Sequence, residues 1–187
     1  WNSVLATPTR SANAGFFYPS ANLSFVASEV INFPAAIDFA KLRFSASGVG
    51  SGGTNPYLTA YNYTTAGSLY SGGLQNPTIL ANPDLKPLRT ITYETGVSLK
   101  MFRGRLDFDI ALYSGNTKDQ ILNRVIDRSS GYTRTVINAG RVNNKGIEIA
   151  LNGSPIKTKN FTWTTGVLFS ANENTIMELA DSSVVLF

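Results

Sequence analysis

The 187-residue sequence contains no cysteine and no histidine. Without cysteine there is no disulfide and no nucleophilic thiol, and without histidine the commonest metal ligand and general base is missing. Charged side chains are also sparse, at 15% of residues against about 25% in an ordinary soluble domain. These absences exclude a catalytic triad and a zinc site of the usual kind. They predict a protein that is not an enzyme and has no cofactor and no metal.

Two further features are missing. No stretch approaches the ~18 consecutive apolar residues of a transmembrane helix. The formal net charge is +4, but the 16 lysines and arginines are scattered and form no basic stripe. A basic stripe is the expected footprint of a protein that binds nucleic acid, so no nucleic-acid partner is predicted.

What the sequence does contain is a strong alternation of apolar and polar residues. Between Thr92 and Met101, one side carries Tyr93, Val97 and Leu99, and the other carries polar or small residues. The rhythm restarts at Leu106 and continues through Leu112. The short link Phe102–Arg105 predicts a tight β-hairpin with one apolar face and one polar face.

Four more segments alternate in the same way: 20–27, 41–47, 146–152 and 161–170. This gives about six strands, most of them ten residues or longer with their ends included. Strands in soluble proteins are usually near five or six residues, whereas ~9–11 residues match a tilted crossing of a bilayer.

The connections between these strands alternate in length. Short links lie near 28–38, 102–105 and 154–160, and long links rich in Gly, Asn, Ser and Thr lie near 48–88 and 123–138. Outer-membrane barrels have short periplasmic turns and long extracellular loops. Aromatic residues gather beside the short links, as a membrane-interface girdle does: Phe33, Phe39, Phe102, Phe161 and Trp163.

A soluble β-sandwich also has alternating strands and polar loops, so a sandwich that binds glycans is the alternative interpretation. The barrel is favoured by charged residues at strand centres, which suit a water-filled lumen: Lys41, Arg43, Glu94, Asp107, Asp109 and Glu148. Six strands are too few to close a barrel in lipid. The fold class predicted is therefore all-β, an antiparallel transmembrane barrel segment of about six strands within a larger barrel. A small barrel assembled from several six-stranded copies is a third possibility.

A series of short motifs follows one another from the middle of the chain to its end: Asn82–Pro87, Tyr93–Gly96, Asn116–Leu122, Ile137–Gly140, Asn143–Glu148 and Asn152–Lys157. Together they closely resemble the SusC/RagA family of TonB-dependent outer-membrane receptors, which are common in Bacteroidetes. The resemblance covers roughly residues 16–180. Leu88 departs from it, because the family usually has Glu there.

The resemblance implies a 22-stranded barrel with an N-terminal plug, in the outer membrane of a bacterial cell. Residues 1–187 then form a partial barrel domain, with no plug domain and no TonB-contacting segment. The implied function is nutrient uptake, the import of oligosaccharides or peptides. The implied partners are a SusD-like surface lipoprotein, outer-membrane lipid and, through the missing N-terminal part, TonB–ExbB–ExbD.

The candidate ligand-binding residues lie in the link 48–88, because carbohydrate rings stack on aromatic faces: Tyr57, Tyr61, Tyr63 and Tyr70. The same link opens with Gly48–Gly53, which fits a dinucleotide-binding G-x-G-x-x-G pattern. That pattern needs a following helix and an acidic residue about 20 positions on. Pro56 follows instead, and residues 66–75 contain no Asp or Glu, so a loop is predicted.

Overall fold

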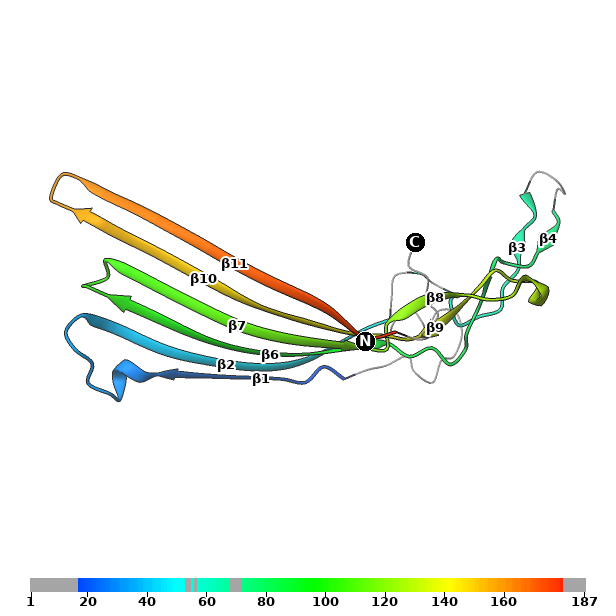
Figure 1. Ribbon diagram of the computed structural model, residues 1–187, viewed down its shortest axis with the longest axis horizontal. Coiled ribbons are helices and arrows are strands. Elements are labelled where there is room, and N and C mark those ends of the chain that lie inside the picture. The colour runs from blue at the N-terminus through cyan, green and yellow to red at the C-terminus, as the bar shows by residue number, and fades with distance from the viewer. Residues whose placement is uncertain (1–16, 53–54, 56, 68–71, 180–187) are drawn as a thin grey trace.

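The computed structural model of the chain describes residues 17–52, 55, 57–67 and 72–179. Six long strands form one antiparallel sheet, and each strand lies beside its neighbours in the sequence (Figure 1). The strands are β1 (Ser20–Val26), β2 (Ile37–Ser51), β6 (Leu88–Met101), β7 (Leu106–Lys118), β10 (Arg141–Lys157) and β11 (Thr162–Glu178). All except β1 are 13 to 17 residues long. The six predicted strands and their unusual length are confirmed.

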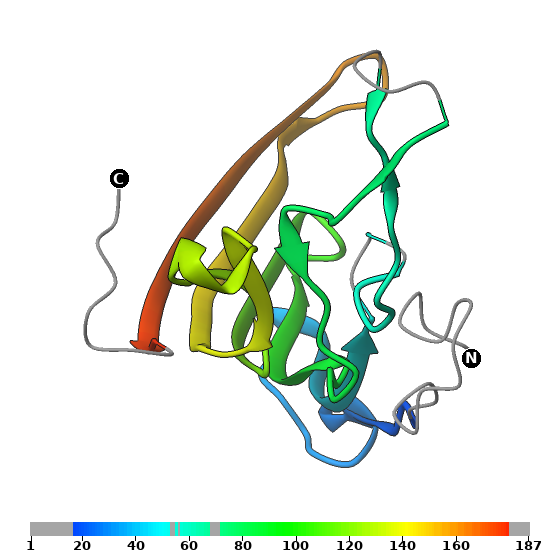
Figure 2. The ribbon, with the colours of Figure 1, turned by 90° about the vertical axis from the view of Figure 1, so that its right-hand side faces the viewer.

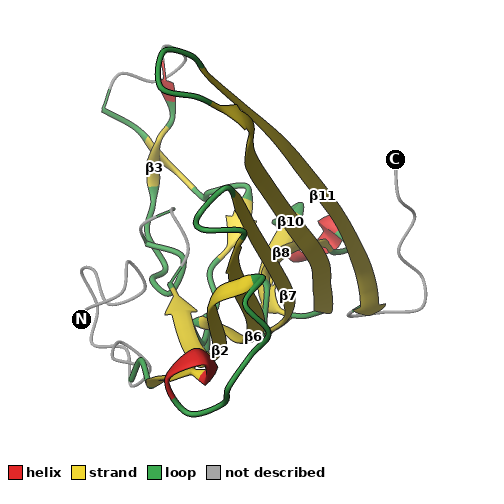
Figure 3. Ribbon diagram, turned by 90° about the vertical axis from the view of Figure 1, so that its left-hand side faces the viewer, coloured by secondary structure: helices red, strands yellow, loops and turns green. Residues whose placement is uncertain are grey.

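The sheet is bent into an arc. Viewed from either end of the strands, β1 and β11 lie at opposite ends of the arc (Figures 2 and 3). Sheets twist because of the handedness of the backbone, and a long twisted meander curls toward a barrel wall. No helix in the described part of the chain is long and apolar enough to cross a membrane.

Three tight connections gather at one end of the sheet, on the left of Figure 1. The β1–β2 connection contains a 3₁₀ turn, η2 (Ala27–Glu29). The β6–β7 turn has three successive residues with positive φ, of 58° at Phe102, 59° at Arg103 and 69° at Gly104. The Gly104 amide donates to an Asp38 carboxylate oxygen at 3.0 Å, which ties this turn to the start of β2.

The two long connections meet at the other end and fold together into a lobe. Its elements are β3 (Thr64–Thr65), β4 (Leu74–Gln75), β5 (Ile79–Leu80), β8 (Ile121–Val125), η4 (Arg128–Ser130) and β9 (Arg134–Asn138). β5 comes from the β2–β6 connection and pairs in parallel with β9, from the β7–β10 connection. Both links are predicted as loops from the sequence, and the three-stranded β5-β9-β8 sheet was not predicted. Gly48 and Gly50 are also predicted in a loop from the sequence, whereas both lie in β2.

The lobe has a small core of its own. Leu85 and Val136 are fully buried, with Leu58, Ile79 and Ile121 packed against them. Because Leu85 and Val136 come from different connections, their contact holds the two together.

Asparagine side chains also join the β2–β6 and β7–β10 connections by hydrogen bonds. The Asn138 amide group accepts from the Lys86 backbone N–H at 2.6 Å and donates to the Lys86 carbonyl at 2.7 Å and the Asp119 carbonyl at 3.0 Å. Asn82 donates to the Val136 carbonyl at 3.0 Å. The Asn82–Pro87 motif is thus attached to the Ile137–Gly140 motif, although more than fifty residues separate them in the sequence.

Candidate functional site

One face of the six-stranded sheet is an apolar surface. The register places Leu42 opposite Val97, and continues that row through Ile110, Ile149 and Phe169. Directly opposed residues of neighbouring strands point to the same side. This side is called the apolar face below, and the row crosses five strands with an apolar residue at every position.

The apolar face is not covered. Among its residues, Phe44 is 48% exposed, Leu112 47%, Val167 61% and Phe169 54%. Within the described residues, no second sheet packs on it, and the helical element that contacts these strands is the three-residue η2 beside the start of β2. Large contiguous apolar patches are rare on soluble monomers. This face therefore requires an apolar environment.

The height of the apolar face fits a bilayer. On β6 it runs from Tyr93 to Met101, about 26 Å along the strand and about 20 Å across a bilayer after a tilt of about 40°. Outer-membrane barrels carry an outward apolar band about 25 Å tall. The hairpin ends carry exposed aromatic side chains as predicted, with Phe102 53%, Phe161 59% and Trp163 52% exposed.

The opposite side, the polar face, carries an ordered set of charged groups. Arg43 Nη2 lies 2.8 Å from Asp109 Oδ1, and Ser98 Oγ donates to Asp109 Oδ2 at 2.6 Å. These residues come from β2, β7 and β6 respectively. The network spans three strands in the middle of the sheet, the position at which the sequence predicted lumen-facing charge.

A glycine makes the Arg43–Asp109 contact possible. Gly96 lies on β6, directly opposite Arg43 and between the two charged residues. A Cβ at Gly96 would stand 2.8 Å from Arg43 Nη2 and 3.0 Å from the Ile110 carbonyl oxygen. Because Gly96 has no side chain, the Arg43 guanidinium can cross β6 at this position and reach Asp109 on β7. The space above Gly96 is called the glycine passage below.

A second glycine on the polar face is covered by an aromatic ring. A Cβ at Gly146 would lie 2.5 Å from Tyr113 Oη and 2.6 Å from its Cζ. Tyr113 stands opposite Gly146 and lies flat against the sheet. The space beside Gly146 on the polar face is therefore taken by Tyr113.

The paired acids Asp107 and Asp109 do not form a catalytic arrangement. The Asp109 carboxylate forms an ion pair with Arg43 and accepts a hydrogen bond from Ser98, and it lies on an open sheet surface. Among the described residues, no group of three or more acidic side chains could hold a metal ion. The polar face can line an aqueous passage, and its charges are arranged to make contacts between strands.

The candidate tyrosines lie in the connection between β2 and β5. Tyr57, Tyr61 and Tyr63 are 49%, 65% and 69% exposed, and Tyr57 has a positive φ of 64°. Tyr70 lies outside the described residues. Their role in ligand binding stays a prediction.

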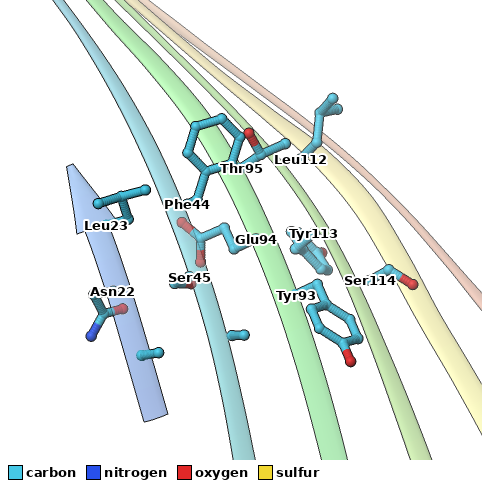
Figure 4. Close-up of a pocket in the computed structure, with 12 residues that line it drawn as sticks. Asn22, Leu23, Phe44, Ser45, Tyr93, Glu94, Thr95, Leu112, Tyr113 and Ser114 are labelled. Carbon is cyan, nitrogen blue, oxygen red and sulfur yellow. The ribbon is translucent and has the colours of Figure 1, made fainter. Parts of the chain in front are cut away.

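The apolar face is hollowed near its lobe end. A shallow trough of ≈ 610 Å³ lies across β1, β2, β6 and β7 (Figure 4). Its larger apolar side chains are Leu23, Phe44, Tyr93 and Leu112, and small residues such as Ala46 and Ser114 leave the space between them. Sequence reasoning missed this trough, because it arises from small residues brought together by the register.

The family profile described as "TonB dependent receptor-like, beta-barrel" matches residues 2–182, nearly the whole chain. The chain belongs to this family. The resemblance to SusC/RagA receptors and the predicted fold class are both confirmed. Proteins of this family are outer-membrane β-barrels.

Curated relatives agree with this assignment. TonB-dependent receptor P39 of Formosa agariphila is 32% identical over 167 residues, which cover 88% of this chain and 16% of the relative. TonB-dependent receptor SusC of Bacteroides thetaiotaomicron is 30% identical over 99 residues, or 52% of this chain and 10% of SusC. The chain thus spans about a sixth or less of the length of these relatives. All are named as receptors rather than enzymes.

Solved structures support the fold. The RagAB peptide importer in its "closed-closed" state matches with a TM-score of 0.81 and 22% identity, over 92% of this chain and 19% of the matched chain. Its "open-open" state matches with a TM-score of 0.80. At this level of identity, the likeness establishes the fold alone.

Proposed function

We propose that this chain forms six wall strands of a TonB-dependent receptor that takes up nutrients across the bacterial outer membrane. The observation that carries the proposal is the uncovered and predominantly apolar face of the sheet below the level of Tyr93, with charged residues on the opposite face. Lipid on one side and an aqueous lumen on the other account for both faces at once. The lobe then lies on the extracellular side and the tight turns lie on the periplasmic side.

The sheet needs further strands. In the described part of the chain, β1 and β11 each pair on one side only, and β11 is exposed along all 17 residues. An open strand edge is not tolerated in lipid, because its backbone groups would stay unpaired. We therefore assign residues 1–187 to part of a larger barrel domain. The plug and the TonB-contacting segment belong to sequence outside these residues.

The names of the relatives support a proposal for the substrate class and the partners. RagAB is described as a peptide importer, and SusC is a TonB-dependent receptor. For this chain, we propose oligosaccharides or peptides as substrates, a SusD-like surface lipoprotein as partner, and TonB–ExbB–ExbD as the source of energy. The exposed Tyr57, Tyr61 and Tyr63 are the proposed ligand contacts from the lobe side, and Tyr70, outside the described residues, is proposed with them.

The test uses the absence of cysteine from residues 1–187, in a complete receptor from which any cysteine elsewhere has been replaced by serine. Single-cysteine variants Ile110→Cys and Ala111→Cys place one thiol on each face at adjacent positions of β7. The complete receptor, labelled with a polarity-sensitive fluorophore in lipid vesicles, is then exposed to lipids that carry a quencher. We expect strong quenching at position 110 and little at position 111.

The other interpretations predict different results. In a soluble β-sandwich, position 110 would be shielded by a second sheet, and lipid quenching would be absent at both positions. A small barrel of several six-stranded copies would give the same quenching as the receptor. It would, however, form an oligomer from the 187-residue chain alone. Either result would contradict the proposal.

A further inference from the structure

The apolar face ends, on the lobe side, in a row of cations. Arg89 on β6 stands opposite Lys118 on β7, and Lys118 stands opposite Arg141 on β10. Pairing of β6 with β7 runs from Arg89–Lys118 to Met101–Leu106 without a register shift. Because side chains alternate strictly along unshifted strands, these three cations project from the same side as the apolar residues below them.

Within the described residues, no acidic side chain forms an ion pair with a cation of this row, although Asp119 and Glu178 line the same hollow as Lys118 and Arg141. Like charges directly opposite each other destabilise a sheet. Within the described residues, neither Arg89 nor Lys118 forms an ion pair, and Glu178, opposite Arg141 on β11, forms none with it. Arg141 Nε donates to Asn116 Oδ1 at 3.0 Å, which directs it toward β7.

Nearby Lys145 provides the contrast. It lies on the same side of β10, four residues below Arg141, and its Nζ is 3.1 Å from Glu173 Oε2 on β11. The sheet therefore neutralises one cation on this side and leaves the row above it open to an external anion.

The trough lies below the row on β6 and β7, the two strands that they share, and extends from there to β2 and β1. Tyr93 and Ser114 form its upper edge on β6 and β7, each four residues from the row, or about 13 Å along the strand. A shallow apolar hollow below a line of cations matches a lipid, which has an acyl chain beneath an anionic headgroup.

We propose that this part of the apolar face binds one phosphate-bearing lipid of the outer leaflet. The headgroup phosphate lies on the row Arg89–Lys118–Arg141, and an acyl chain lies in the trough. Arginine suits this task, because its planar fork matches phosphate oxygens in a bidentate contact. The proposal rests on the proposed function, which puts the lobe end of the strands at the outer leaflet.

The test measures binding of lipid A to the complete receptor in phosphatidylcholine nanodiscs, by native mass spectrometry. The variant combines Arg89→Gln, Lys118→Gln and Arg141→Gln. The matched control combines Arg103→Gln, Lys157→Gln and Lys159→Gln, which remove three cations at the opposite end of the sheet. We expect affinity to fall about fivefold for each cation removed from the row, and to stay unchanged in the control.

Two additional measurements separate the parts of the proposal. Dephosphorylated lipid A should bind wild type and the triple variant equally. The row contacts only the phosphate, so without the phosphate the loss of the row should not change the affinity. Ala46→Phe, which fills the trough, should weaken lipid A binding while the row is intact. If the triple variant does not fold, the single Arg89→Gln change should still give about a fivefold loss.

The outcomes are distinct from those of the proposed function. Equal lipid A affinity in wild type and in the folded row variants would overturn the lipid site. An equal loss in the control triple would also overturn it, because it would reflect net charge alone. Failure of the wild-type receptor to enter nanodiscs would instead contradict its placement in the membrane.

Discussion

The sheet and the lobe of this chain differ in how far they bury their large apolar side chains. In the sheet, large apolar side chains such as Leu112 and Val167 are 47% and 61% exposed, whereas in the lobe Leu85 and Val136 are 0% and 1% exposed. A segment in water must bury its apolar residues, and a sheet facing lipid has no reason to do so. Burial thus divides the chain at the boundary between the sheet and the lobe.

The two regions also differ in how their backbone N–H and C=O groups are hydrogen-bonded. In the middle of the sheet, the β6–β7 and β7–β10 ladders each run over thirteen residue pairs without a register shift. The lobe has ladders of two to five residues. It supplements them with side chains such as Asn82 and Asn138, which bond directly to backbone groups. The lobe should therefore depend on single side chains more than the sheet does.

The largest effect is expected at the lobe core. Leu85→Ala should destabilise the lobe by about 2–5 kcal/mol, because it removes a fully buried side chain and leaves a cavity. The measurement is hydrogen exchange. The Lys86 amide, which donates to Asn138, should lose protection while the β6–β7 ladder keeps it. Leu122→Ala, at a 37% exposed position of β8, is the control and should have a smaller effect.

Loss of protection in the lobe and the sheet together would show that the two regions unfold as one unit. That result would contradict the division drawn from burial.

The next largest effect is expected from a charge placed on the apolar face of the sheet, compared with a charge on the polar face. Ile110→Arg should cost about 2–4 kcal/mol in a lipid refolding assay, because it places a charge on the apolar face, the proposed lipid side, near the middle of the strand. Ala111→Arg, one residue along β7, points to the polar face opposite Glu148 and should cost much less. Equal costs for the two variants would mean that the faces are wrongly assigned.

The sequence predicts the sheet well and the lobe poorly, for a physical reason. Strands that separate lipid from water must alternate over their whole length, so segments such as Leu106–Leu112 show their faces directly. In the lobe, β5 has two residues and pairs with β9, 55 positions away. No periodicity can be read from two residues. The parallel β5–β9 pairing depends on how two separate connections meet.

The functional residues divide in the same way. Polar-face charges such as Asp109 were predicted from alternation alone, but the partner Arg43 and the passage at Gly96 depend on the register of three strands. The row Arg89–Lys118–Arg141 could have been found by extending the alternation of β6, β7 and β10 toward the long connections. The trough could not, because it depends on which small residues become neighbours.

A smaller effect is expected at the glycine passage in the sheet. Gly96→Ala should cost about 1–3 kcal/mol, because the new methyl group would meet Arg43 Nη2 and the Ile110 carbonyl. Measured in an Arg43→Ala background, the cost should be smaller, since the residues then no longer compete for space. Gly115→Ala is the control, because its nearest atom, Thr92 Oγ1, is 3.4 Å away. If Gly96→Ala destabilised the wild type and the Arg43→Ala variant equally, Gly96 would not be the position at which the Arg43 side chain crosses β6.

The smallest expected effect is a pH response in the lobe. The Ser129 backbone N–H donates to the Asp127 carboxylate at 2.8 Å, and this bond holds the pKa of Asp127 below its usual value. A group with a lowered pKa stabilises the folded turn above its ordinary pKa, and the contribution is lost as pH falls through the lowered value. With selective ¹⁵N-serine labelling, the Ser129 amide shift should therefore titrate below the range of an ordinary aspartate. Asp127→Asn keeps a side-chain acceptor but removes the charge, so it should abolish this titration and leave the turn formed. A midpoint at or above the ordinary value would mean that the carboxylate does not hold η4, and that the lobe depends less on single side chains than its hydrogen bonds indicate.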